Sequence, residues 1–390
     1  MRGQVVGGGV SGVREITTGT ATAGQTSISA TYSVGYVDVY VNGVRLMPDD
    51  YTATSGTTIV LDTGMALNDE YLVVTWTVVS LEDTSLMVTE PGGRLTLESG
   101  APVMTAEQAN KTVVYYTPYK HDLCPIYDGT TWARKRFAEL TLTLGSNWAA
   151  DSNYDLYVIN DGGTIRLATG AAWTNATTRS ESLTRLNGIL TNAATMTARY
   201  GNSSTVSVPA NRATYVGTFR TTGSTGTTTW ELGGEAASGD PVKLYLWNTY
   251  NRIKVDAYVA STTDSWTNGV AAFASMQAST TWRVTIVRGL NDDGVLATIT
   301  AGMLAGAGSS AIAGIGLDST TARAAASSCA FNNSSSVAGA SAGVYSGRPG
   351  LGMHYLQALE YGSATTNTFY GYASSGGALQ LTALSFQGMF

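Results

Sequence analysis

Short runs of Val, Ile, Thr, Tyr and Trp alternate along the chain with clusters of Gly, Asn, Asp and Ser. Such runs, bounded by turn-forming residues, are typical of β-strands. Clear examples are 57–62, 70–79, 94–99, 112–119, 138–144, 154–160, 213–221, 241–248, 252–260, 281–290, 294–300 and 378–386. We therefore predict a mainly β fold, made of several consecutive antiparallel domains of the β-sandwich or jelly-roll type.

Three segments depart from this simple pattern. The segment RSESLTRLNGILTN (179–192) places Leu183, Leu186 and Leu190 at helical spacing, which predicts one or two helical turns. Residues 350–362 favour a broad strand. The Gly-, Ser- and Ala-rich region 301–347 is interrupted by apolar residues, so we predict short strands joined by long loops there.

The segment VDVYVNGVRLMPDDY (37–51) predicts a complete hairpin. Asn42-Gly43 is the strongest signal for a two-residue type I′ turn, because both central residues need a positive φ. This turn aligns one apolar and one polar face in a single register. The apolar pairs are Val41 with Val44, Val39 with Leu46 and Val37 with Pro48, and the polar-face pairs are Tyr40 with Arg45 and Asp38 with Met47. Runs 57–62 and 70–79 supply a third and a fourth strand of a small β-sandwich.

Domain limits follow from shifts in composition. The segment SLEDTSLMVTEPGG (80–93) mixes charge, Pro and Gly after a strand-rich block and is expected to be a linker. A further strand-rich block begins near residue 250. We therefore expect a terminal peptide over 1–20, a small β module over 21–80, a middle β domain over 90–250 and a C-terminal β domain over 251–390.

Charge is scarce in this chain. Hydrophobic residues make up 43% of the sequence and charged residues only 13%, against about a quarter charged in ordinary soluble domains. The net charge of −6 gives no electrostatic footprint for nucleic acid, so no nucleic-acid partner is expected. No apolar run is long enough to span a membrane, and the first residues lack the apolar core of a secretory signal. The composition suits an extracellular or particle-borne protein better than a metabolic enzyme.

Cysteine and histidine offer little metal or redox chemistry. Cys124 and Cys329 are too few and too far apart for a disulfide framework, and both are expected to be reduced. His121 lies three residues before Cys124, but no second pair of ligands follows, so no metal site is predicted. We also expect no cofactor, because no phosphate-binding loop, zinc motif or nucleophile elbow is present.

Three acidic pairs are the candidates for carboxylate catalysis: Asp49-Asp50, Asp69-Glu70 and Asp292-Asp293. Each lies in a turn-like context, where Asp and Asn form local hydrogen bonds to the backbone. We therefore expect these carboxylates to hold turns and predict no catalytic residues.

The hairpin and its continuation also resemble a known module. Residues 35–76 look like a module that recurs in bacteriophage tail-fibre, head-fibre and tail-associated proteins. They share its Asn-Gly hairpin, its D-Y-T-A-T step at 50–54 and its N-D-E-Y return at 68–71. Residues 91–132, together with 215–222 and 244–255, are similar to the middle region of phage fibre proteins. The resemblance covers most of residues 35–260, and the C-terminal third matches less.

This resemblance implies a virion structural protein in an elongated, homotrimeric fibre. Its partners would be other copies of itself, other virion proteins (portal, adaptor, tail or capsid) and a host surface glycan or protein. The N-terminal peptide would anchor the fibre to the particle through Val5, Val6, Val10 and Val13. The C-terminal domain would be the distal tip, with aromatic and polar receptor-binding candidates at Trp266, Trp282, Tyr345, His354, Tyr355, Tyr361, Phe369, Tyr370 and Tyr372.

Two other functions stay open on the sequence alone. The chain could be a decoration or adaptor subunit of the virion that touches no receptor. A polysaccharide depolymerase is less favoured, because such spikes use a carboxylate pair and are usually built on repeating β-helical coils, for which the sequence shows no period.

Overall fold

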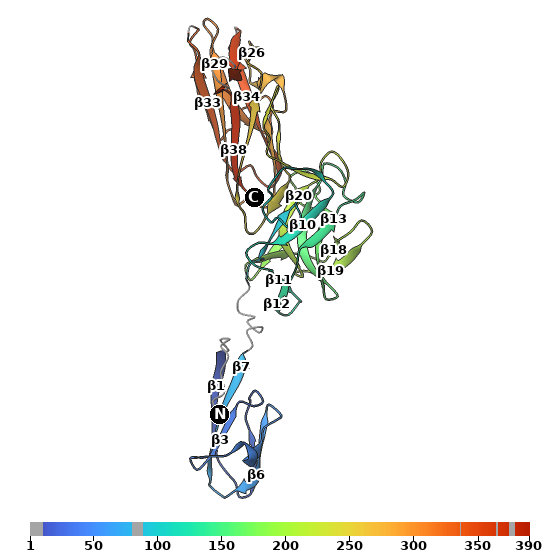
Figure 1. Ribbon diagram of the computed structural model, residues 1–390, viewed down its shortest axis with the longest axis vertical. Coiled ribbons are helices and arrows are strands. Elements are labelled where there is room, and N and C mark those ends of the chain that lie inside the picture. The colour runs from blue at the N-terminus through green and yellow to red at the C-terminus, as the bar shows by residue number, and fades with distance from the viewer. Residues whose placement is uncertain (1–10, 80–88, 336, 364–365, 374–378) are drawn as a thin grey trace. The chain divides into compact units, whose positions relative to one another are not determined.

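The structure is a computed structural model that describes residues 11–79, 89–335, 337–363, 366–373 and 379–390. The chain divides into two compact units, Met1–Met87 and Val88–Phe390 (Figure 1). Each unit has its own cluster of buried apolar residues. The division falls inside the 80–93 segment that the sequence marks as a linker. Almost all elements are strands, which confirms the mainly β prediction.

The first unit is a small β-sandwich. One sheet has the order β1-β7-β3-β4, with bounds Ser11–Thr20, Glu70–Val79, Val37–Val41 and Val44–Arg45. The other has the order β2-β6-β5, with bounds Gln25–Ser29, Thr58–Met65 and Tyr51–Thr52. Val39 and Val73 of the first sheet are fully buried in one cluster with Ile28 and Ile59 of the second. The two sheets therefore close over a common core.

The hairpin turn has the predicted register. Val41 pairs with Val44 and Tyr40 with Arg45, and Asn42 and Gly43 both have a positive φ. Pairing beyond Arg45 is limited to a hydrogen bond from the Leu46 backbone N to the Val39 backbone O, because the chain soon enters a short 3-10 helix, η1 (Pro48–Asp50).

The predicted apolar face of the hairpin is only partly buried. Val39 is fully buried, whereas Val44 is 67% exposed. β4 has only two residues and lies at the edge of its sheet among the described strands.

Residues 11–20, which the sequence assigns to a free anchoring peptide, form a strand of the same sandwich. β1 pairs with β7 in an unbroken antiparallel register from Ser11 opposite Val79 to Thr20 opposite Glu70. No described strand pairs with the other edge of β1. Residues 1–10, with Val5, Val6 and Val10, lie outside the described residues, and Val13 is part of β1.

The second unit contains three eight-stranded sheets among its described residues. The first comprises β14 (Asn153–Asp161), β15 (Thr164–Ala172), β16 (Leu183–Leu186), β17 (Ile189–Asn192), β18 (Met196–Arg199), β19 (Thr205–Val208), β20 (Ala213–Arg220) and β24 (Leu246–Asn248). The second comprises β9 (Gln108–Lys111), β21 (Thr228–Glu231), β23 (Val242–Leu244), β27 (Ala274–Ser275), β28 (Arg283–Arg288), β30 (Ala311–Leu317), β32 (Phe331–Asn332) and β34 (Gly352–Gly362). The third comprises β22 (Glu235–Ala236), β25 (Lys254–Ser261), β26 (Ser265–Asn268), β29 (Val295–Leu304), β31 (Ser327–Cys329), β33 (Gly339–Gly347), β35 (Asn367–Tyr370) and β38 (Ala383–Met389).

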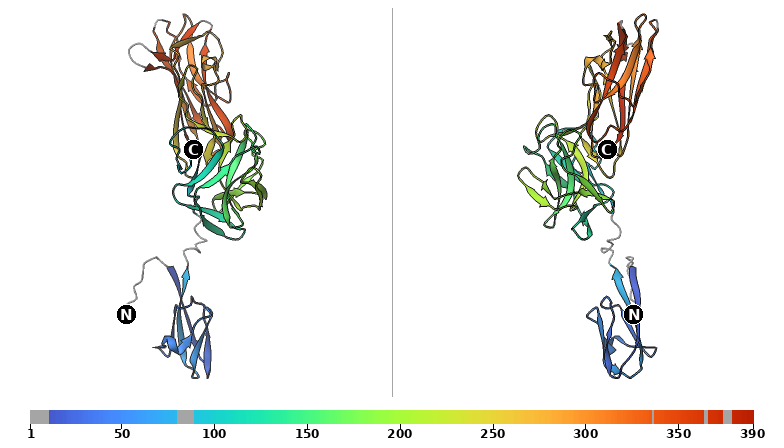
Figure 2. Two further views of the ribbon diagram at one scale, coloured as in Figure 1. Left: turned by 45° about the vertical axis from the view of Figure 1, so that its right-hand side comes forward. Right: turned by 180° about the vertical axis from the view of Figure 1, so that it is seen from behind.

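Smaller sheets complete this unit. One sheet has the order β13 (Leu140–Thr143), β10 (Val113–Pro118), β8 (Gly93–Thr96). A second sheet consists of β11 (Leu123–Tyr127) and β12 (Trp132–Arg136), and a third of β36 (Tyr372–Ala373) and β37 (Leu379–Gln380). A second 3-10 helix, η3, covers Met276–Ala278. Figures 1 and 2 show β29, β33, β34 and β38 running together in one part of this unit, with β10, β13, β18 and β19 in the other.

The second unit is continuous through residue 250, where the sequence analysis places a domain boundary. β9, β21 and β23 precede that residue, yet they share a sheet with β28, β30 and β34, which follow it. β23 and β28 pair in parallel, with Val242 opposite Val284. The buried guanidinium of Arg94 donates to the backbone O of Asn251 and of Phe390, at 3.2 and 3.0 Å. The two halves of the unit thus share both sheet and core.

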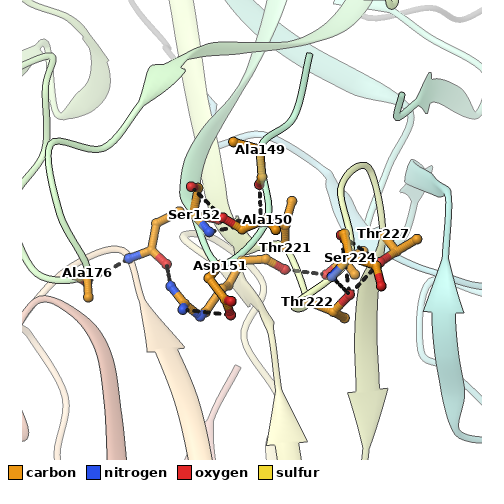
Figure 3. A network of polar contacts seen from close by, with 12 residues as sticks. Ala149, Ala150, Asp151, Ser152, Ala176, Thr221, Thr222, Ser224 and Thr227 are labelled. Atoms are coloured by element: carbon orange, nitrogen blue, oxygen red, sulfur yellow. Dashed lines mark hydrogen bonds and ion pairs between the residues drawn. The ribbon is translucent and has the colours of Figure 1, made fainter. Parts of the chain in front are cut away.

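A polar network contributes a second joint between these halves, and Figure 3 shows the part of it near Asp151 and Ala176. Arg220, at the end of β20, donates to Asn153 Oδ1 at 3.1 Å and to Asp151 Oδ1 at 3.3 Å. Asn153 Nδ2 donates to the backbone O of Ala176 at 2.7 Å, and the same oxygen accepts from the backbone N of Met353 at 2.8 Å. The loop that carries Ala176 therefore links β14 and β20 to the start of β34.

The helical prediction for 179–192 is wrong. This segment forms the antiparallel hairpin β16–β17, with Leu186 opposite Ile189. Asn187 and Gly188 make its turn, both with a positive φ. This is the same Asn-Gly dipeptide as in the hairpin at Asn42-Gly43. It favours a two-residue turn with positive φ at both residues, a conformation that is not helical. By contrast, the predicted broad strand at 350–362 is confirmed as β34.

Candidate functional site

An exposed apolar surface lies on one face of the sheet formed by β32, β30 and β34. Ile312 of β30 pairs with Phe331 of β32 on one side and with Tyr361 of β34 on the other. Residues directly opposite each other in adjacent strands point to the same face of a sheet. The three side chains therefore form a row across three strands. Phe331 is 61% exposed, and Ile312 and Tyr361 are half-buried.

Phe273 extends this row from the loop before β27. Its ring centroid lies 5.5 Å from that of Tyr361, at an interplanar angle of 54°. Gly314, two residues after Ile312, lies below the ring, since a Cβ on Gly314 would be only 3.3 Å from Phe273 Cε1. We call Phe273, Ile312, Phe331 and Tyr361 the aromatic patch. It is a contiguous apolar surface with two half-buried rings and one exposed ring.

Polar side chains surround the aromatic patch. Arg323 is exposed, and its Cδ would lie 3.9 Å from a Cβ on Gly314. The hydroxyl of Tyr361 belongs to the patch itself. Apolar ring faces with a few polar groups around them are the usual composition of a surface that binds a ligand with both apolar and hydroxyl groups.

A buried carboxylic acid lies on β34 next to the patch. Glu360 precedes Tyr361, so its side chain points to the opposite, inner face of the strand, where it is 4% exposed. Trp266 Nε1 donates to Glu360 Oε2 at 2.5 Å. Burial raises the pKa of Glu360 to about 7, although hydrogen bonds from Trp266 and its other neighbours oppose this shift. The side chain is therefore able to change its protonation state near neutral pH.

Most of the receptor-binding candidates named from the sequence lie elsewhere. Trp282, Tyr345 and Phe369 are buried in the core. Trp266 is half-buried and stacks on Phe369, with centroids 5.9 Å apart. These side chains pack in the interior. Because Trp282, Tyr345 and Phe369 are buried, they are not accessible to a receptor.

The remaining candidates are scattered. His354 is buried, with its Nδ1 2.7 Å from Asp318 Oδ2. Tyr355 is half-buried beneath the guanidinium of Arg283, which lies 3.8 Å from its ring centroid. Tyr370 and Tyr372 are half-buried on β35 and β36. Of all the candidates, Tyr361 alone belongs to the aromatic patch.

The sequence analysis missed Phe273 and Phe331. Phe331 is a lone aromatic residue in the stretch SSCAFNNSSS, between small and polar neighbours. An isolated large apolar residue in such a segment has few neighbouring apolar side chains against which to pack. Its position in the sequence therefore indicates that it could be exposed. Phe273 gives no comparable signal, because its place depends on the contact with β34.

The acidic pairs take part in local structure. Asp50 Oδ2 accepts from the backbone N of Met47 at 2.8 Å in η1. Asp69 Oδ2 accepts from the backbone N of Ala66 at 2.7 Å. Asp292 and Asp293 both form ion pairs with Arg252. Asp50 and Asp69 thus hold turns, and Asp292 and Asp293 hold an ion pair with a distant arginine.

Cys124 is buried and Cys329 is exposed, and both are free in the structure. His121 Nδ1 accepts from the backbone N of Leu123 at 3.3 Å. In the described part of the chain, no group of three or more His, Cys, Asp or Glu side chains is placed to hold a metal ion. Nor does any helix within those residues have the length and hydropathy needed to cross a membrane.

Comparisons of the chain with protein-family models, with curated proteins and with solved structures found no match.

Proposed function

We propose that the chain is a structural protein of a bacteriophage particle, of the fibre type that its sequence resembles, and that it contacts a glycan of the host surface through the aromatic patch. The observation that carries the proposal is the row Phe331, Ile312 and Tyr361, exposed on one sheet face and extended by Phe273. The low charge and the mainly β fold support a particle-borne protein.

Glycan recognition suits this surface. Sugar rings present apolar C–H faces that pack on aromatic rings, and hydroxyl groups that need hydrogen-bond partners. The aromatic patch supplies ring faces, and the Tyr361 hydroxyl and the Arg323 guanidinium supply polar groups at its border. A single large exposed ring such as Phe331 is the kind of side chain on which a contact surface depends most strongly.

The test compares point variants on intact particles. Phe331→Ser should lower the adsorption rate constant by about tenfold or more, which corresponds to an increase of about 1.4 kcal/mol or more in the activation free energy of adsorption. Tyr258→Ser is the matched control, because Tyr258 is also an exposed ring, on β25 of a different sheet. Near-UV circular dichroism of both variants checks that the fold is retained.

Normal adsorption by Phe331→Ser and by Phe273→Ser particles would contradict the adhesive role. The chain would then be a decoration or adaptor subunit. Removing residues 251–390 is a poor substitute for these variants, because it would take β28, β30 and β34 out of the sheet that also contains β9, β21 and β23.

Self-association and attachment to the particle are also part of the proposal. The edge of the ten-residue strand β1 that no described strand occupies offers a row of backbone groups to which another chain can add a strand. We assign this edge to contact with other copies of the chain or with other virion proteins. A homotrimer should have three times the 40.7 kDa mass of one chain, and sedimentation of the purified protein checks this.

A further inference from the structure

A polar cleft of about 450 Å³ lies in the second unit, at a place that none of the predicted candidates occupies. Its walls come from the hairpin β11–β12, from the turn between β14 and β15, and from β19 with the loop that follows it. The polar groups on its lining are Asp128, Lys135, Asn160, Asp161, Ser207 and Arg212. Its volume falls within the range of about 300–1,000 Å³ that is typical of small-molecule sites.

Lys135 faces inward from its hairpin. It pairs with Cys124 across β11–β12, and Ala133 pairs with Ile126. Cys124 and Ile126 are buried, and residues two apart on a strand lie on the same side of it. Lys135 is therefore on the side of β12 that faces the protein. It forms no ion pair within the described residues.

Arg212 is positioned from the opposite wall of the cleft. Its guanidinium lies against Gly129, at a place where any Cβ on that glycine would collide with Arg212 Nη2. Gly129 has a φ of 106°, which the turn requires and which glycine adopts without strain. Among the parts of the chain that the structure describes, no carboxylate lies within ion-pair distance of Arg212.

The carboxylates of the cleft are already engaged. Asp128 Oδ1 accepts from the backbone N of Thr130 and of Thr131, both at 2.8 Å. Those backbone bonds, and to a smaller extent the charge of Arg212, lower the pKa of Asp128. Asp161 forms an ion pair with Arg166 at 2.8 Å. Hydrogen bonds leave the negative charge of Asp128 in place, whereas Arg166 offsets that of Asp161. Lys135 and Arg212 together outweigh the charge of Asp128, so the cleft carries a net positive charge that attracts an anion.

We propose that this cleft binds an acidic saccharide, with the sugar carboxylate held by Lys135 and Arg212. The Asn160 amide and the Ser207 hydroxyl supply hydrogen-bonding groups for sugar hydroxyls, and Tyr127 and Pro209 supply apolar wall. The cleft lies on different strands from the aromatic patch and, unlike the patch, is expected to prefer a ligand with a negative charge. It stands whether or not the aromatic patch contacts a host glycan.

The inward lysine also has a purely structural explanation. An inward-pointing charge protects an exposed strand from pairing with another chain, and β12 pairs only with β11 among the described strands. If that were its whole role, replacing Lys135 would increase aggregation and leave ligand binding unchanged. A binding measurement therefore separates the two roles.

The experiment measures binding of glucuronic acid, glucose and inorganic phosphate to the full chain by saturation-transfer NMR and calorimetry. Glucuronic acid should bind at least about tenfold more tightly than glucose, because one well-placed charge contact contributes more than about 1.4 kcal/mol. Lys135→Gln and Arg212→Gln should each weaken glucuronic acid binding by a similar factor. Lys120→Gln is the matched control, because Lys120 is exposed and does not line the cleft.

Several results would overturn the proposal. Absence of glucuronic acid binding rejects the site, and equal binding of glucose rejects the role of charge. Phosphate binding as tight as that of glucuronic acid would show a general anion site and reject the assignment to a sugar. Unchanged binding by both cleft variants, with near-UV circular dichroism like that of the native chain, would leave Lys135 with its structural role alone.

Discussion

Glu360 shows how a single residue makes stability depend on pH. Its carboxyl group is buried beside Trp266, and this burial raises its pKa to about 7 from an ordinary value of 4.5. The folded chain therefore keeps the proton to a higher pH than the unfolded chain does. The stabilisation is complete below about pH 4.5 and is lost as the pH rises through about 7. A shift of this size corresponds to about 3 kcal/mol.

We predict that Glu360→Gln removes this dependence. The amide is neutral at every pH, and its oxygen can still accept the hydrogen bond from Trp266 Nε1. The free energy of unfolding of the variant should exceed that of the native chain at pH 8 by up to about 3 kcal/mol, and the difference should shrink towards pH 4.5. Urea unfolding of both proteins at pH 5 and pH 8 measures it.

Glu235→Gln is the control for this measurement, because Glu235 is exposed. It should change the free energy of unfolding little at either pH. A difference between Glu360→Gln and the native chain that is the same at pH 5 and pH 8 would refute the assigned protonation change.

At the scale of elements, Asn-Gly turns decide two hairpins. Asn42-Gly43 and Asn187-Gly188 both have positive φ values, and each joins two strands in register. The second turn lies in a segment whose leucine spacing also fits a helix. The hairpin forms because Asn and Gly tolerate the left-handed region that a type I′ turn needs. A helix of one or two turns is not stable by comparison, because its few hydrogen bonds do not offset the entropy cost of nucleation.

We predict that Gly188→Ala destabilises the second unit by about 1–2 kcal/mol, the cost of the left-handed conformation for a residue with a Cβ. A Cβ at Gly188 would contact nothing within 4 Å, so no steric clash adds to this cost. Gly294→Ala is the control. That glycine has no positive φ, and its Cβ would make only an ordinary contact at 3.4 Å. Equal midpoints of thermal unfolding for the two variants would contradict the prediction.

At the scale of the whole molecule, two separate cores imply two folding units. The buried cluster of the first unit contains residues between 21 and 73, and the cluster of the second contains residues between 95 and 390. Residues on both sides of position 250 belong to the second cluster. Arg94 of β8 donates to the backbone O of Asn251 and of Phe390, and Asn251 Nδ2 donates to the backbone O of Gly93 in the same strand.

We therefore predict that residues 1–79 and 89–390 each fold when produced alone, and that residues 89–250 do not. The last fragment would expose the edge of β23 that pairs with β28, together with much of the shared core. Calorimetry of the full chain should show two transitions, each matching one of the two larger fragments. A cooperative transition in the 89–250 fragment would show that residue 250 is a true domain boundary.

Part of the candidate site could be predicted from the sequence. Tyr361 is among the candidates because the resemblance implies receptor contact by aromatic side chains of the C-terminal third. The composition does not distinguish it from Trp282 or Tyr345, which are buried. Exposure depends on which strand and loop cover each ring, and those neighbours come from distant parts of the chain.

The mainly β class, the strand at 350–362, the register next to the Asn42-Gly43 turn and the turn roles of Asp50 and Asp69 follow from the sequence alone. These features depend on residues within a few positions of one another, through turn geometry and side-chain alternation. Long-range contacts place β1 in the first sandwich, pair β23 with β28 across residue 250, and bring Phe273 against Tyr361. Such contacts join residues far apart in the sequence, and their choice depends on which apolar faces bury one another when the whole chain folds.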